Sequence, residues 1–224
     1  MLFIGNSLTY MNDLPALVCA LAEAAGETPP VMQRVVASGF SLEDHWERGD
    51  ARKAIAEGGW DFVVLQQGPS ASPEGRGLLL RYARLFASEI RRAGAKPALY
   101  MVWPSVRRRQ DFGDVCDSYR LVARDIDGLL LPAGEAWRSV EKRALKFDLY
   151  SSDGLHPTVA GSYLAGSVIY AQFYGRSPLG LSAHLTLPSG VTVDLPPGDA
   201  RLLQEAAAEA VEKFGHPAPR SSKN

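Results

Sequence analysis

Short apolar runs alternate along the chain with longer segments in which apolar residues recur every three or four positions. The short runs predict strands, at residues 1–5, 31–37, 62–66, 97–103 and 129–132. The longer segments predict helices, at residues 12–25, 51–57, 78–93, 113–125 and 158–174. Because strands that alternate with helices form βαβ units, we expect an α/β fold with a mostly parallel five-stranded sheet and helices on both of its faces.

The pattern changes after the last of these helices. Residues 185–193 predict a small hairpin, and residues 199–214 predict one more helix. We expect this part, 181–215, to pack on the rest, so that residues 1–215 form a single domain. From residue 216 the composition turns to Pro, Ser and Lys, and we expect residues 216–224 to be a disordered tail.

The composition is that of an ordinary globular protein, with 46% hydrophobic and 22% charged residues. A net charge of −1 gives no overall field that attracts a nucleic acid, and no apolar run is long enough to span a bilayer, so we expect neither partner. Cys19 and Cys116 lack metal-type spacing and are expected to be buried thiols. No basic and apolar leader precedes the first strand, so we expect a cytoplasmic protein, or a secreted or periplasmic one whose leader lies outside this sequence.

The first informative turn is Gly5-Asn6-Ser7, where the first strand ends and a helix begins. A glycine at this point permits a sharp turn, and the free backbone N–H groups of a helix N-terminus favour an oxyanion. Ser7 is therefore a candidate nucleophile. The alternative is that Ser7 only caps the helix, as a serine at such a position commonly does.

The second turn holds Asp153 and His156, in the run Ser-Asp-Gly-Leu-His-Pro. In a tight turn this spacing can bring the carboxylate beside Nδ1 of the imidazole and leave Nε2 free. A serine hydroxyl needs a base to take its proton, and the base works best when a carboxylate fixes its tautomer. Ser7, His156 and Asp153 supply these three roles. Taken alone, the Asp-x-x-His pair is better explained as a helix cap beside a surface histidine.

Other candidates lie where ligands bind in open parallel sheets, at the carboxyl ends of the strands. Trp103 ends a strand there and is a candidate wall of the substrate pocket, although core packing explains it equally well. The run Arg107-Arg108-Arg109 follows, and such a run is usually a solvated face. His45 is expected to lie at the surface or to anchor a loop rather than to act as a base.

These motifs resemble the sequence blocks of the SGNH (GDSL-like) hydrolases. The first block, usually Gly-Asp-Ser, is similar to residues 5–8, the glycine of the second block matches Gly39, and the last block, Asp-x-x-His, matches residues 153–156. The resemblance spans residues 1 to about 175. It implies a flavodoxin-like three-layer α/β/α sandwich and a serine esterase mechanism without metal or cofactor, in which the backbone N–H groups of Ser7 and Gly39 are oxyanion donors.

One block departs from the family pattern. The third block is typically Gly-x-Asn-Asp, whose Asn side chain is a further oxyanion donor, whereas residues 65–70 read Leu-Gln-Gln-Gly-Pro-Ser and put Ser70 at the Asn position. Neighbouring strand side chains point to opposite faces, so we expect only one of Gln66 and Gln67 to reach the site, and we assign Gln66. The alternative is that both amides bind loop backbone.

The sequence thus predicts a serine esterase of small or carbohydrate-linked acyl esters, acetyl esters above all, that acts through an acyl-enzyme. Thioesters, short lipids and acyl transfer to an alcohol are further options. One rival is a flavodoxin-like binding module in which the turn after the first strand cradles a phosphate or nucleotide. Another is a hydrolase-like scaffold that has lost its activity, for which the altered third block is the main argument.

Overall fold

The computed structural model describes residues 1–143 and 148–215. In these residues five parallel strands form a sheet in the order β2-β1-β3-β4-β5. The strands are β1 (Leu2–Gly5), β2 (Gln33–Val36), β3 (Phe62–Leu65), β4 (Lys96–Tyr100) and β5 (Leu129–Leu131). The predicted α/β class and the five-stranded parallel sheet are confirmed.

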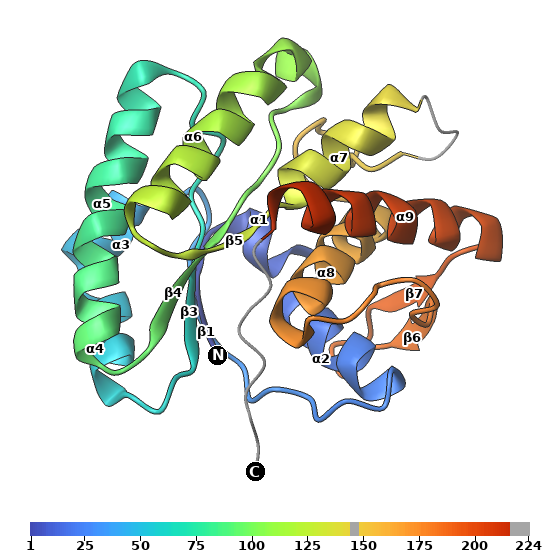
Figure 1. Ribbon diagram of the computed structural model, residues 1–224, viewed down its shortest axis with the longest axis horizontal. Helices are drawn as coiled ribbons and strands as arrows, with labels where there is room; N and C mark the ends of the chain where they lie inside the picture. The colour runs from blue at the N-terminus through green and yellow to red at the C-terminus, as the bar shows by residue number, and fades with distance from the viewer. Residues whose placement is uncertain (144–147, 216–224) are drawn as a thin grey trace.

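Helices cover both faces of the sheet and connect its strands. They are α1 (Ser7–Tyr10), η1 (Met11–Asp13), α2 (Leu14–Ala24), α3 (Leu42–Arg48), α4 (Asp50–Glu57), α5 (Pro73–Arg92), η2 (Val106–Asp111), α6 (Phe112–Asp125), α7 (Ala133–Lys142), α8 (Val159–Tyr174) and α9 (Pro197–Phe214). Figure 1 shows α4 and α5 on one side of the sheet and α2 and α8 on the other. This is the three-layer α/β/α arrangement of a flavodoxin-like fold.

The strands are buried or exposed according to their place in the sheet. The central strands β1 and β3 are continuous apolar runs, Leu2–Ile4 and Val63–Leu65, and these residues have no exposed surface, because helices cover both faces. At the edge of the sheet, β2 carries the exposed side chains of Gln33 and Arg34. A charged residue on an edge strand opposes pairing with another chain.

The helices differ from the sequence prediction in several places. The helix predicted at 12–25 is broken, because Asn12 and Asp13 adopt left-handed conformations with φ of 51° and 52° and α2 starts after them. The helix α5 starts at Pro73, five residues before the predicted start, with Ser72 as its cap. The helix α7 was not predicted. It contains Gly134, where an added Cβ would lie 2.3 Å from the carbonyl oxygen of Val102, so the helix packs closely against the segment after β4.

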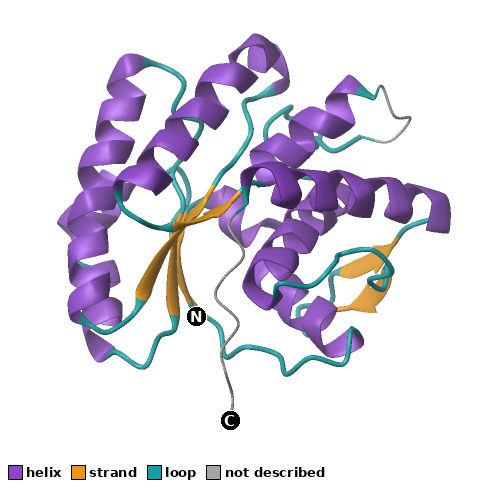
Figure 2. Cartoon of the chain, in the orientation of Figure 1, coloured by secondary structure: helices purple, strands orange, loops and turns teal. Residues whose placement is uncertain are grey.

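The predicted C-terminal elements are present. The strands β6 (His184–Thr186) and β7 (Thr192–Asp194) pair antiparallel as a hairpin, which Figure 2 shows apart from the central sheet. The helix α9 packs against α7 and α8. That residues 1–215 form a single domain stays a prediction, and the tail expected at 216–224 lies outside the described residues.

Two further sequence expectations concern the cysteines and the membrane. Both thiols are free, and Cys116 is buried while Cys19 is half-buried. Among the helices of residues 1–143 and 148–215, none has both the length and the apolar composition needed to cross a bilayer.

Candidate active site

Ser7 is presented by a tight turn at the end of β1. A Cβ on Gly5 would lie 2.4 Å from Oε1 of Gln66 and 2.5 Å from Oγ1 of Thr9, so the turn accepts only glycine there. Asn6 caps α1, since its Oδ1 accepts from the backbone N–H of Leu8 at 3.1 Å. Ser7 is therefore the first residue of the helix rather than its cap, and its hydroxyl is left for another partner.

That partner is His156, which lies 149 residues further along the chain. The Oγ of Ser7 lies 2.8 Å from Nε2 of His156, and Nδ1 of His156 lies 2.5 Å from Oδ2 of Asp153. In the tautomer that fits these contacts, Ser7 donates to Nε2 and the Nδ1–H group donates to the carboxylate. The structure thus brings together the three side chains that the sequence assigned to nucleophile, base and orienting carboxylate.

The loop that carries Asp153 and His156 is held in place by backbone contacts. It turns at Gly154, whose φ of 72° favours glycine. The carbonyl of Gly154 accepts from the N–H of Val106 at 2.8 Å, and both the N–H and the Oγ of Ser151 donate to the carbonyl of His156, at 2.8 and 3.0 Å. These contacts fix the imidazole without using either of its ring nitrogens.

The Asp153 carboxylate is stabilised in its ionised form. It accepts from the backbone N–H of Leu155 at 2.8 Å, from the His156 side chain, and from the backbone N–H of His156 at 2.9 Å. These hydrogen bonds, the one from Leu155 first, lower the pKa of Asp153 to about 2. The carboxylate therefore stays charged throughout the range in which a histidine base works.

The pH dependence of activity should reflect this difference. Catalysis needs an unprotonated base, so activity should fall at low pH. The Asp153 interaction is fully present above the unfolded carboxyl pKa of about 3.9 and is lost only as the pH falls through about 2, so it should add no second loss of activity above roughly pH 4.

Asp153→Asn should lower kcat by on the order of 10²–10⁴ across the pH profile, because it disturbs the tautomer of the base. Steady-state kinetics from pH 4 to 9 test this. A second acid limb in the wild-type protein would contradict the assignment.

Two backbone N–H groups were expected from the sequence to be oxyanion donors. Among the described residues, neither the N–H of Ser7 nor that of Gly39 donates to another atom. The loop with Gly39 is tied to the nucleophile turn, because Nδ2 of Asn6 donates to the carbonyl of Phe40 at 2.9 Å and the N–H of Ala37 donates to Gly5 at 3.2 Å. Gly39 is exposed and has a φ of 73°, a conformation that other residues adopt with strain.

The expectation that Gln66 is the side-chain oxyanion donor is wrong. Gln66 has no exposed surface, and its Oε1 accepts from the N–H of Asn6 and from Oγ1 of Thr9, both at 2.8 Å. The backbone N–H of Asn6 can only donate, which fixes the orientation of the amide. Its Nε2 is buried, with no partner among the described residues. Gln66 therefore stabilises the turn that presents Ser7.

Gln67 and Ser70 do not replace it. The Oε1 of Gln67 accepts from the N–H of Leu42 at 3.2 Å, and its Nε2 donates to Oγ of Ser70 at 3.1 Å. Ser70 in turn donates to the carbonyl of Gly68 at 3.0 Å. For Gln67 the alternative from the sequence holds, because its side chain serves loop backbone.

The expectation that Trp103 forms a wall of the substrate pocket is wrong as well. Its side chain is fully buried and stacks on Trp137, with ring centroids 3.6 Å apart. Its Nε1–H donates to the carbonyl of Leu155 at 3.0 Å. Trp103 thus stabilises the loop of Asp153 and His156 from the hydrophobic core.

The remaining sequence candidates have structural partners. His45 is a buried loop anchor rather than a surface residue: its Nε2 lies 2.8 Å from the carbonyl oxygen of Gly5, and burial lowers the pKa of the ring. Arg108 pairs with Asp111, and Arg109 pairs with Glu141, each at 2.5 Å. In residues 1–143 and 148–215 no group of three or more His, Cys, Asp or Glu side chains is placed to hold a metal ion.

The sequence analysis missed Asn12. Its Nδ2 donates to the carbonyl of Pro157 at 3.0 Å and to Oγ of Ser162 at 2.9 Å, so it joins the segment after Ser7 to the residue after His156. An asparagine inside a predicted helix, followed by Asp13, was the available signal, because these two residue types tolerate left-handed conformations. Asn12 therefore links the segment that carries Ser7 to the segment that carries His156.

Asn12→Gly should lower kcat by about tenfold with little change in KM, because a small misplacement of the base relative to the nucleophile slows the reaction more than it weakens binding. Glycine keeps the left-handed backbone, so the variant removes only the side-chain bonds. Kinetics and a thermal melt of the same sample separate the two effects. A lower Tm with unchanged kcat would show that Asn12 serves only the fold.

Comparison with known proteins places the fold among hydrolases. No family model and no curated protein sequence matches the chain. A candidate SGNH hydrolase from Slackia heliotrinireducens is 26% identical, with a TM-score of 0.63, and covers 75% of this chain and 95% of its own. A DUF4886 family protein from Bacteroides uniformis is 18% identical, with a TM-score of 0.74, and covers 95% of this chain and 94% of its own. An acetyl-xylooligosaccharide esterase from Geobacillus is 17% identical, with a TM-score of 0.56, and covers 75% and 89%.

The other similar structures include the protein TesA and a lipase/acylhydrolase from Enterococcus faecalis, both with TM-scores of 0.60. Each of these two proteins covers 75% of this chain. The resemblance inferred from the sequence is confirmed: the structural neighbours of this chain are SGNH (GDSL-like) hydrolases, esterases and lipases, matched over most of its length.

Proposed function

We propose that this protein is a serine hydrolase of small or carbohydrate-linked acyl esters, acetyl esters above all, with Ser7 as nucleophile, His156 as base and Asp153 as the carboxylate that orients the base. The observation that carries the proposal is the unbroken series of contacts from Ser7 Oγ to Nε2 at 2.8 Å and from Nδ1 to Asp153 at 2.5 Å. Nucleophile and base within hydrogen-bonding reach, with the base held by a third group, are the arrangement that serine acylation requires.

In the acylation step, Oγ of Ser7 attacks the acyl carbon while its proton passes to Nε2 of His156. Asp153 stabilises the imidazolium that forms. The oxyanion accepts hydrogen bonds from the backbone N–H groups of Ser7 and Gly39. When the tetrahedral intermediate collapses, the Nε2–H proton goes to the leaving alcohol, and the acyl group stays on Oγ. Water then attacks the acyl-enzyme while His156 takes its proton. When this second intermediate collapses, the proton passes from Nε2 to Ser7 Oγ and the acid is released.

The oxyanion hole in this mechanism has two backbone donors and no side-chain amide. The Gln66 amide is fully buried with its oxygen bonded to Asn6, the Gln67 amide bonds to Leu42 and Ser70, and Ser70 is bonded to Gly68. One donor is worth on the order of 10²–10³ in turnover. We therefore expect a slow enzyme rather than an inactive scaffold, because nucleophile, base and carboxylate are all in contact.

The acetyl and carbohydrate part of the proposal is supported by a structural neighbour. One structural neighbour is an acetyl-xylooligosaccharide esterase, which shares the fold at 17% identity. The same neighbours include lipases, so the acyl chain length has to be measured. Rates for a series of p-nitrophenyl esters from acetate to octanoate, and for acetylated sugars, compare short acyl chains with long ones and simple esters with carbohydrate esters.

The test is hydrolysis of p-nitrophenyl acetate by the purified protein, followed by labelling with an alkyl fluorophosphonate and peptide mass spectrometry. The proposal expects release of p-nitrophenolate and one phosphonate group on the peptide with Ser7. A coloured protein that carries flavin and releases no p-nitrophenolate would overturn it in favour of the flavodoxin-like binding module.

A further inference from the structure

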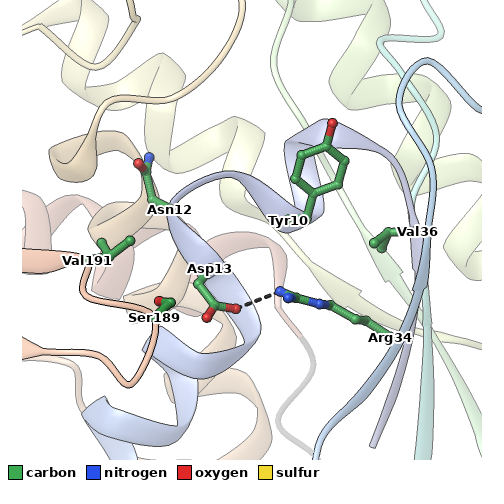
Figure 3. A pocket seen from close by; sticks show the side chains of 7 residues that line it. All are labelled: Tyr10, Asn12, Asp13, Arg34, Val36, Ser189 and Val191. Atoms are coloured by element: carbon green, nitrogen blue, oxygen red, sulfur yellow. Dashed lines mark hydrogen bonds and ion pairs between the residues drawn. The ribbon is translucent and has the colours of Figure 1, made fainter.

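A cavity of about 340 Å³ lies between the segment after Ser7, the edge strand β2 and the loop that joins β6 to β7 (Figure 3). Its size is at the small end of the range for ligand pockets, about 300–1,000 Å³. The lining residues come from these three parts of the chain: Tyr10, Asn12, Asp13, Arg34, Val36, Ser189 and Val191.

The cavity adjoins the proposed catalytic residues. Tyr10 follows Ser7 by three positions on α1, and residues at this spacing lie on the same helix face with Cβ atoms roughly 5–6 Å apart. Val36 stands opposite Gly5 in the β1–β2 register, three residues before Gly39. Asn12 contacts Pro157, the neighbour of His156. A group in the cavity is therefore close to an acyl carbon at Ser7.

The Asp13 side chain is directed into the cavity instead of capping its helix. Asp13 holds the N-cap position of α2, where aspartate usually accepts from a helix N–H, yet it forms no such bond. Its backbone takes the left-handed conformation, with a φ of 52°, and its Oδ1 lies 2.6 Å from Nη1 of Arg34 (Figure 3). The strained backbone of Asp13 and the absence of a cap bond accompany the placement of its carboxylate beside the Arg34 guanidinium.

The charges of the pair favour a neutral, hydroxylated ligand. An anion would meet the carboxylate of Asp13, and a cation would meet the guanidinium of Arg34. A sugar hydroxyl can donate to Asp13 and accept from Arg34, in charge-assisted hydrogen bonds. Both groups are accessible, with 18% and 46% of their side chains exposed. The Tyr10 ring and Val36 offer apolar surface to the carbon face of a sugar ring.

We propose that this cavity binds the sugar part of an acylated carbohydrate, with Asp13 and Arg34 as the hydroxyl-binding pair and Tyr10 as the apolar platform. The proposal rests on the esterase function proposed above and names the alcohol side of its substrate. It also gives the β6–β7 hairpin a part in specificity, because Ser189 and Val191 close the side of the cavity away from the sheet (Figure 3).

The first experiment measures selectivity with two esters, p-nitrophenyl acetate and a mono-O-acetylated methyl xyloside. In Arg34→Ala and in Asp13→Asn, the ratio of kcat/KM for the xyloside to kcat/KM for p-nitrophenyl acetate should fall about tenfold, mainly through KM, since each variant removes a charged hydrogen-bond partner. Asparagine also tolerates the left-handed backbone, so Asp13→Asn is the variant that keeps the fold. The matched control is Arg84→Ala, which breaks an exposed ion pair of the same length, 2.6 Å to Asp125, and should leave the ratio unchanged.

The second experiment measures binding without turnover. Ser7→Ala should bind the acetylated xyloside in calorimetry, and adding Arg34→Ala should weaken that binding about tenfold. An unchanged selectivity ratio in both Arg34→Ala and Asp13→Asn would overturn the sugar site while leaving the esterase intact. Binding that depends on Arg34 in a protein that cleaves neither ester would support the site and refute the esterase. If the variants instead change the preference among p-nitrophenyl acetate, butyrate and octanoate, the cavity holds the acyl chain and the sugar assignment is wrong.

Discussion

Ser7→Ala should reduce ester hydrolysis to the background rate, a loss on the order of 10⁴–10⁶ in kcat, because in the described part of the chain no other hydroxyl bonds to Nε2 of His156. The fold should be nearly unaffected. The Ser7 hydroxyl bonds only to His156 among the described residues, and the helix is capped by Asn6, so the free energy of unfolding should change by about 1 kcal/mol or less. Turnover of p-nitrophenyl acetate and a thermal melt measure the two quantities.

Ser72→Ala is the matched control for this prediction. Ser72 caps α5 through its Oγ, which accepts from the N–H of Gly75 at 3.1 Å, and it lies outside the catalytic contacts. Its replacement should lower stability by about 1 kcal/mol and leave turnover unchanged, the reverse of the Ser7 pattern. Full activity in Ser7→Ala, or phosphonate bound to another residue, would remove Ser7 from the mechanism.

His156→Ala should be about as damaging as the serine variant, because nucleophile and base act as a unit and the loss of either leaves the serine unactivated. Added imidazole should restore part of the activity, since the space left beside Ser7 admits a small base. The measurement is kcat with and without imidazole at a pH where imidazole is neutral.

His184→Ala is the control for the histidine. His184 pairs with Asp194 on the hairpin at 2.6 Å, so it forms the same kind of histidine–carboxylate contact, but among the described residues no serine hydroxyl bonds to its ring; Ser182 bonds only to its backbone. Its replacement should leave turnover unchanged. If His184→Ala or His45→Ala inactivated the protein while His156→Ala did not, the base would be assigned to the wrong residue.

Local sequence patterns were sufficient for the sheet and for the three proposed catalytic residues. The strands are short apolar runs, and burial on both faces makes such runs continuous, as in Leu2–Ile4. Asp153 and His156 stand three residues apart, so one turn built on Gly154 brings them into contact. Ser7 follows a glycine that only a close approach explains.

The side-chain contacts of the third block, residues 65–70, could not be predicted from local sequence patterns. Strand alternation correctly separated the two glutamines, but it gave no information on what each amide would meet. Gln66 lies beside the turn that presents Ser7. The buried N–H of Asn6 needs an acceptor there, and the side-chain oxygen of Gln66 is that acceptor. Trp103 similarly lies at the carboxyl end of β4, but the stack on Trp137 keeps it in the core.

The sequence by itself determined the α/β layers, the parallel sheet, the hairpin and the residues that face each other within one turn, because periodicity and turn chemistry act over a few positions. The tertiary structure alone decided which distant groups meet. Asn12 contacts Pro157 across 145 residues, and Asp13 meets Arg34 across 21, in a cavity that the hairpin closes from the far end of the chain. Such contacts depend on how the helices pack on the sheet and on which buried polar groups find partners, and no local pattern contains that information.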